Sequence, residues 1–127
     1  MKVTDHLEVR AGICEFRPRG ESSLVDAVEL ITRAIAYCRD RHIDKLLVVT
    51  TGLSGVSIPT LVDRFLMVEE WARAANGMVV AALVASPEYI HPEKFGVRVA
   101  ADFGFVADVF SSEADALRWL STYRLPS

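Results

Sequence analysis

The chain opens with a pattern of apolar and polar positions that predicts a β-hairpin. Leu7 and Val9 alternate with polar neighbours, which is the period of a half-buried strand. A second short apolar stretch lies at residues 13–16, and Gly12 between the two stretches allows a tight turn. We therefore expect two antiparallel strands that meet at this glycine.

Two long segments have the three- and four-residue spacing of amphipathic helices. The first runs to residue 41 behind Ser23, an N-cap residue with Asp26 three positions later to answer it. The second is expected to begin at Pro59, which suits a first helical position, and to end at Gly77. Its predicted inward stripe consists of Leu61, Val62, Phe65, Val68, Ala72 and Ala75.

Two shorter helices and three buried strands complete the pattern. One helix is expected from Pro92 to Gly104, and the last opens at Ser112 with Asp115 as its cap partner. Between the helices lie apolar runs without alternation, which are typical of strands covered on both faces. These runs fall at residues 46–49 and 78–84, and a last strand is expected at residues 106–110.

The order of elements is therefore β-β-α-β-α-β-α-β-α. Strands that alternate with helices imply right-handed crossovers, so the sheet is expected to be mostly parallel after the opening hairpin. The chain has no repeat, linker or low-complexity stretch. We expect a single α/β domain over residues 1–127, with a mixed, mostly parallel sheet packed by helices.

Charge and composition narrow the function. Seventeen acidic residues outnumber fourteen basic ones, so no broad positive field is available for nucleic acid. The basic stretch at residues 17–19 is interpreted as a solvated turn. No apolar run approaches the about 20 residues of a membrane span, and residues 1–6 lack the continuous apolar stretch that a signal peptide would have. Cys14 and Cys38 match no metal-ligand spacing and fit buried, reduced thiols in a cytoplasmic protein.

Candidate chemistry lies after the parallel strands, where open α/β sheets carry their sites. The loop at residues 50–57, with Ser54 and Gly55, can offer backbone N–H groups to an anion, but it has no nucleotide-binding motif. A turn followed by a cap is the plainer interpretation. The segment at residues 86–94 gathers Tyr89 and His91, and His91 is either a proton shuttle or a helix-entry residue.

The element order and several segments resemble the STAS superfamily, and more narrowly the SpoIIAA-like bacterial domains. The most distinctive segment is a strand ending in Phe110, followed by an acidic helix with an Ala-x-x-Trp-Leu pattern at residues 116–120. The other matching segments are the opening hairpin and residues 45–49, 53–56 and 80–84. The resemblance implies a mixed sheet with helices, no cofactor, and action through protein contacts or apolar ligand binding.

The resemblance also raises the question of a phosphorylation switch. Anti-sigma factor antagonists of this superfamily are switched at a serine that follows an aspartate, where the helix after this loop starts. Residues 57–60 contain no such pair. Ser57 and Thr60 are the candidate phosphoacceptors by position, but neither lies in the motif, so gating by phosphorylation is not expected.

Three hypotheses follow. The first is a non-enzymatic binding or regulatory module, a homodimer or the partner of another protein, with Leu66, Met67 and Trp71 as its contact surface. These residues lie off the predicted inward stripe, although core packing is the other interpretation of Trp71. The second is a carrier of a small apolar or lipid-like ligand, with a cavity between the sheet and the helices at 59–76 and 92–103. The third is an enzyme built on His91, Tyr89 and Glu93.

Overall fold

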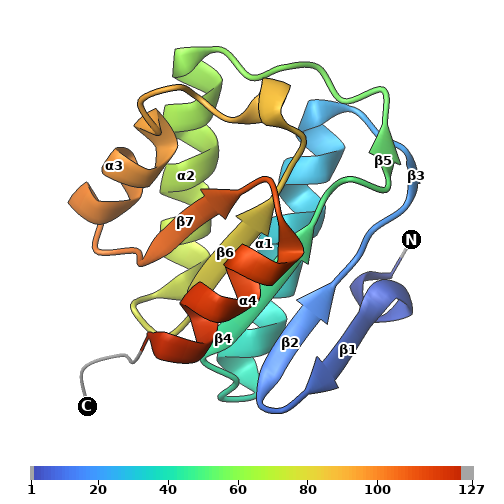
Figure 1. Cartoon of the computed structure of the whole chain (residues 1–127), viewed down its shortest axis with the longest axis vertical. Helices are drawn as coiled ribbons and strands as arrows, with labels where there is room; N and C mark the ends of the chain where they lie inside the picture. Colours follow the sequence, from blue (N-terminus) through green and yellow to red (C-terminus); the bar gives the residue numbers. More distant parts are fainter. Residues whose placement is uncertain (1, 124–127) are drawn as a thin grey trace.

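The central feature of the computed structural model, which describes residues 2–123, is a five-stranded sheet (Figure 1). The first two strands form the predicted antiparallel hairpin, and every later pairing within this sheet is parallel. The mixed, mostly parallel sheet expected from the sequence is therefore confirmed. In spatial order its strands are β1 (Leu7–Arg10), β2 (Ile13–Phe16), β4 (Lys45–Val49), β6 (Val80–Val84) and β7 (Ala107–Phe110).

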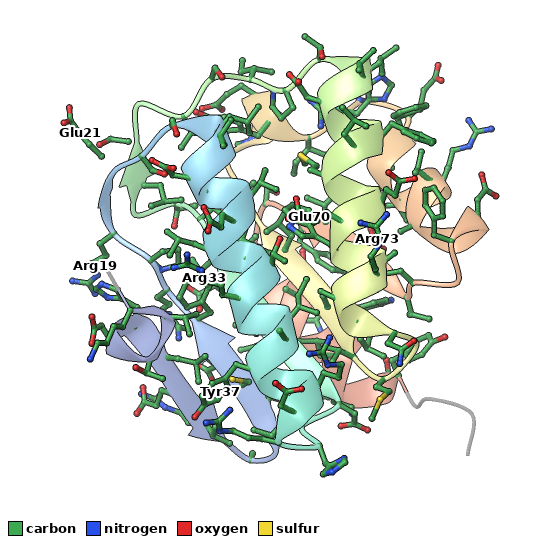
Figure 2. The ribbon with its side chains drawn as sticks, turned by 180° about the vertical axis from the view of Figure 1, so that it is seen from behind. Arg19, Glu21, Arg33, Tyr37, Glu70 and Arg73 are labelled. Carbon is green, nitrogen blue, oxygen red and sulfur yellow. The ribbon has the colours of Figure 1, made fainter. Side chains whose placement is uncertain are left out.

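Helices cover both faces of this sheet. On one face lie α1 (Leu24–Asp40), α2 (Leu61–Ala75) and α3 (Phe95–Asp102), and α4 (Glu113–Thr122) lies on the other. Figure 2 shows α1 and α2 side by side on the face away from α4. None of the described helices is long and apolar enough to cross a bilayer.

Alternate residues of the strands divide the core into two parts. Leu46 and Val48 of β4 belong to the cluster under α1, α2 and α3, whereas Leu47 and Val49 belong to the cluster under α4. Cys14 and Cys38 lie in the first cluster, where both are fully buried free thiols. A hydrogen bond from the Cys38 thiol to Cys14, together with burial, raises the pKa of Cys38.

The N-caps predicted for two of the helices, Ser23 and Ser112, are confirmed. Ser23 accepts a hydrogen bond from the amide of Asp26 at 3.0 Å, as predicted, and Ser112 caps α4 in the same way. The prediction that α2 begins at Pro59 is wrong: Thr60 is the N-cap and forms a reciprocal capping box with Asp63. A helix with a complete box starts at the box rather than at the preceding proline.

The second wrong boundary is the start of α3, which begins at Phe95 rather than at Pro92. The 3₁₀ turn η2 (Pro87–Tyr89) and a left-handed Lys94 (φ 51°) occupy the stretch before it. A short 3₁₀ turn forms local backbone hydrogen bonds but has no helical spacing of apolar residues. Its sequence therefore cannot be told from that of a loop.

Three short elements have no counterpart in the prediction. These are η1 (Val3–His6) and the two-residue strands β3 (Gly20–Glu21) and β5 (Leu53–Ser54), which pair parallel with each other. Outside that ladder, the amides of Gly20 and Ser22 donate to the carbonyl oxygens of Gly52 and Ser54. The loop after β4 is thereby fixed to the segment before α1. Two-residue strands are too short to show a period of two.

Candidate functional site

The first candidate site is an outward apolar stripe on α2 and the residues just before it. Its members recur at the spacing of one helical face, and Phe103 from the end of α3 joins it through an edge-on contact with Phe65 at 5.6 Å between ring centroids. Each is between 41% and 68% exposed. We call this set the α2 patch: Ile58, Leu61, Val62, Phe65, Leu66 and Phe103.

The α2 patch corrects the predicted orientation of the helix. Leu61, Val62 and Phe65 were expected to face inward but are exposed, whereas Val68 and Ala75 of the same predicted stripe are buried, together with Trp71 and Ala74. The helix has apolar residues on two faces, so periodicity alone does not decide which face packs on the sheet.

The predicted contact surface of Leu66, Met67 and Trp71 is therefore only partly available. Leu66 is 55% exposed, but Trp71 is only 7% exposed, and its indole N–H donates to the carbonyl oxygen of Val28 at 3.2 Å. Met67 is half-buried and packs against the first core cluster. Trp71 as a surface residue was wrong, and its interpretation as a core residue is confirmed.

The second candidate site is a cavity of about 170 Å³ between the sheet and α1, α2 and α3. It lies where the carrier hypothesis placed it. Its floor is formed by β-strand residues, and its walls come from the three helices and from the segments that follow β4 and β6. The apolar part of the lining includes Val28, Ile31, Met67, Trp71, Leu83 and Val97.

A few polar groups also line this cavity. Arg64 of α2 is half-buried, and its Nη1 donates to the carbonyl oxygen of Tyr89 at 2.9 Å. Burial lowers the pKa of the Arg64 guanidinium. Lys94 also lines the cavity, but its ammonium is paired with Asp108 at 2.8 Å. An apolar pocket with a small number of placed polar groups is the usual form of a small-molecule site.

Carbonyl oxygens of the loop after β4 accept hydrogen bonds from other segments: those of Gly52 and Ser54 from backbone amides before α1, and that of Val56 from the Tyr89 hydroxyl. Ser54 belongs to β5, and Gly55 follows in a left-handed conformation (φ 81°). A Cβ at Gly52 would lie 3.0 Å from the carbonyl oxygen of Pro18, a contact so tight that the Pro18 backbone would have to shift by a few tenths of an ångström to accept it. Ser57 and Thr60 are both exposed, and the hydroxyl of Thr60 accepts the amide of Asp63 in the α2 cap.

The residues proposed for catalysis do not form a hydrogen-bonded constellation. The hydroxyl of Tyr89 donates to the carbonyl oxygen of Val56 at 2.6 Å, and Nδ1 of His91 accepts the amide of Glu93 at 3.1 Å. Within residues 2–123, no hydrogen bond joins the side chains of these three candidates, and no cluster of metal-ligating residues is found. Tyr89 and His91 do line the cavity described above.

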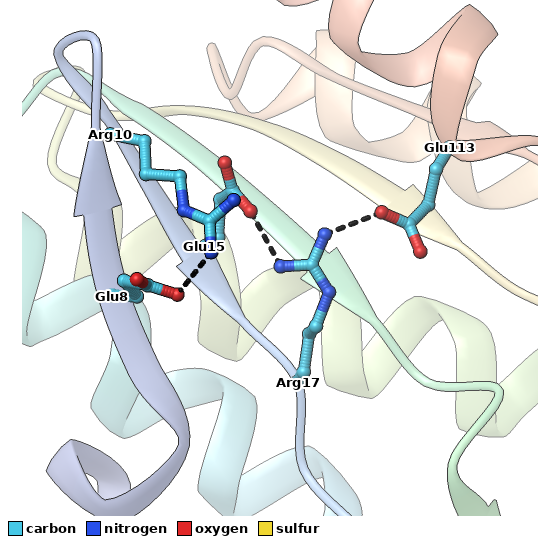
Figure 3. A network of polar contacts seen from close by, with 5 residues as sticks. All are labelled: Glu8, Arg10, Glu15, Arg17 and Glu113. Atoms are coloured by element: carbon cyan, nitrogen blue, oxygen red, sulfur yellow. Dashed lines mark hydrogen bonds and ion pairs between the residues drawn. The ribbon is translucent and has the colours of Figure 1, made fainter.

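An ion-pair network around one buried carboxylate is a feature that the sequence did not reveal (Figure 3). Glu15 of β2 is 7% exposed, and Arg17 binds both its carboxylate and that of Glu113 at the start of α4, each at 2.5 Å. The solvated turn predicted for residues 17–19 is thus wrong for Arg17 and for Pro18, which is fully buried. Only the alternation of an acid and a base at positions 15 and 17 hinted at the first pair.

Comparisons with known proteins bear on the fold. No protein-family model and no curated protein matches the chain. Among solved structures, that of the anti-sigma factor antagonist SpoIIAA in its unphosphorylated form is similar, with a TM-score of 0.51 and 18% sequence identity. The match covers 92% of this chain and 97% of that one. The protein therefore has the SpoIIAA-like fold of STAS domains, and the resemblance inferred from the sequence is confirmed at the level of the fold.

Proposed function

We propose that this protein is a non-enzymatic interaction module that pairs with a second copy of itself through the α2 patch. The exposed apolar stripe carries the proposal. The fold supports it, since one similar solved structure is that of an anti-sigma factor antagonist. The buried free thiols Cys14 and Cys38 suit action in the cytoplasm, where thiols stay reduced.

The size of the α2 patch suits an interface. From the exposed fractions of its six residues, it presents roughly 600 Å² of side-chain surface, at the upper end of what monomeric proteins leave contiguous. A standard interface buries about 800 Å² on each partner. The patch and a narrow rim around it supply that area.

The composition of the α2 patch favours a second copy as its occupant. All six members are aliphatic or aromatic, and homodimer interfaces are the more apolar class. In a twofold dimer the same patch meets itself, so apolar surface covers apolar surface and no complementary charge is needed. The net charge of −3 opposes pairing of two copies only weakly.

Sedimentation equilibrium over a range of concentrations tests the proposal. The native chain is expected to be a dimer, and Leu66→Lys is expected to weaken self-association at least tenfold because it places a charge at the centre of an apolar interface. Val9→Lys is the matched control: Val9 is 50% exposed on the edge strand β1, away from α2. A native chain that stays monomeric at every concentration would contradict the proposal.

The cavity favours a second function, the carrying of a small apolar ligand. Its volume of about 170 Å³ is close to that of apolar protein cavities that take up benzene-sized molecules. Trp71 lines it, so binding is expected to change the fluorescence of that indole. The titrations described below test this function with uncharged probes, independently of the oligomeric state.

A further inference from the structure

We propose that Arg64 makes the cavity selective for small monocarboxylates, with the apolar body of the ligand between the sheet and the helices and its carboxylate on the guanidinium. This inference rests on the carrier function proposed above. It adds a chemical class of ligand and a residue that determines the selectivity.

Arg64 differs from the other arginines in its surroundings. It is half-buried, yet no carboxylate within residues 2–123 forms an ion pair with it, and its one side-chain hydrogen bond in that range is to the carbonyl oxygen of Tyr89. The cavity's other strong cation, Lys94, is neutralised by Asp108. Of the other half-buried arginines in the described residues, Arg17 and Arg39 are both paired with carboxylates; the other described arginines without an ion pair, Arg19, Arg41, Arg73 and Arg98, are exposed.

A half-buried guanidinium without an acid is costly, because burial removes part of its hydration and the Tyr89 carbonyl replaces only one of five donors. The remaining N–H groups can bind a planar carboxylate through two parallel hydrogen bonds. Arg64 lines a cavity that is mostly apolar. A ligand with one anionic end and an apolar body can therefore bind the guanidinium and fill the apolar space at the same time.

The volume limits the size of the ligand. An apolar cavity of about 150 Å³ holds one benzene molecule, so the cavity here suits a body of about six to eight non-hydrogen atoms. Short-chain and arylacetic acids have this size. We therefore take hexanoate and phenylacetate as probes, each with its uncharged isostere, hexanamide and phenylacetamide.

The test is a fluorescence titration in a Trp119→Phe background, where Trp71 alone reports on the cavity. Each acid is expected to bind at least tenfold more tightly than its amide, since a hydrogen bond to a charged group contributes more than a neutral one. Arg64→Gln keeps a donor for the Tyr89 carbonyl but removes the charge. It is expected to lower the affinity for the acid to that for the amide and to leave the amide unchanged.

Two variants serve as controls. Arg73→Gln removes a charge from the exposed side of the same helix, visible in Figure 2, and is expected to leave the preference for acids intact. Gly96→Leu is expected to fill the cavity and abolish binding of all four probes. A Cβ at Gly96 would lie 3.6 Å from Cγ2 of Val68, an ordinary contact, so the backbone position accepts a side chain; far-ultraviolet circular dichroism checks that the leucine variant is folded.

The outcomes separate the two claims. Equal affinity for acid and amide in the parent protein would overturn the role of Arg64 and leave the carrier function standing. Binding of none of the four probes would overturn both. An acid preference that Arg64→Gln removes and Arg73→Gln retains is the result expected here.

Discussion

At the scale of single residues, Arg17 fixes the start of α4 to strand β2. It is the only described partner of the buried Glu15 carboxylate, and it also holds Glu113 (Figure 3). A buried carboxylate that loses its cation keeps the cost of desolvation without the compensating attraction. The pair therefore matters for stability chiefly because removing Arg17 would leave the Glu15 carboxylate buried without a cation.

We expect Arg17→Met to lower the free energy of unfolding by about 2 kcal/mol, less than for a fully buried pair because Arg17 is about a third exposed. Urea unfolding followed by circular dichroism measures the change. Arg33→Met is the control: the Arg33–Glu29 pair on α1 is more than half exposed, and its loss is expected to leave the midpoint unchanged. Equal effects of the two variants would contradict this account.

At the scale of elements, the sequence predicts best those helices that have a single apolar face. All the residues that α1 buries, among them Ile31, Ile35 and Cys38, lie on the stripe expected from their spacing. In α2 the apolar residues form two stripes, and the choice between them depends on the sheet, which is not encoded locally. The sequence therefore predicts that this helix exists, but it does not predict which apolar residues of its first turns face the sheet.

The candidate sites also combine one feature that could be expected from the sequence with one that depends on tertiary contacts. The carrier hypothesis expected a cavity between the sheet and the helices at 59–76 and 92–103, and the structure has a cavity there. The isolation of Arg64 was not predictable. It depends on the carbonyl oxygen of Tyr89, which is 25 positions away in the sequence, and on the pairing of Lys94 with Asp108.

The hairpin turn offers an element-scale prediction. Ala11 and Gly12 both have positive φ, 49° and 79°, as a type I′ turn requires. Alanine is disfavoured in this region, whereas asparagine adopts it readily. Ala11→Asn is expected to raise the free energy of unfolding by about 0.5 to 1 kcal/mol, measured by urea denaturation.

Gly12→Ala is the opposite test of the same turn. A Cβ at Gly12 meets nothing within 4 Å, so any loss comes from the backbone conformation alone. We expect a loss of about 1 kcal/mol. A stabilising Gly12→Ala, or an Ala11→Asn that destabilises, would show that the turn does not need left-handed residues.

At the scale of the whole molecule, the sheet is shared by two layers of unequal size. Three helices cover one face, and α4 covers the other with Ala116 and Leu120 buried against the strands. Leu46 and Leu47 are neighbours in β4 but point into different clusters. Both clusters pack on the same strands, so unfolding one layer would expose the sheet that supports the other. We therefore expect the two layers to unfold together as one domain.

The two tryptophans test this expectation, because Trp71 lies in the first cluster and Trp119 packs against the second. In Trp119→Phe the fluorescence reports on the three-helix layer, and in Trp71→Phe it reports on α4. Within each variant, the urea midpoint from fluorescence is expected to coincide with that from far-ultraviolet circular dichroism, as in a two-state transition. The comparison is made within each variant because Trp71→Phe also loses the hydrogen bond to Val28 and is less stable overall. A Trp119 transition that precedes the circular dichroism would mean that α4 detaches first and that its layer is a separate cooperative unit.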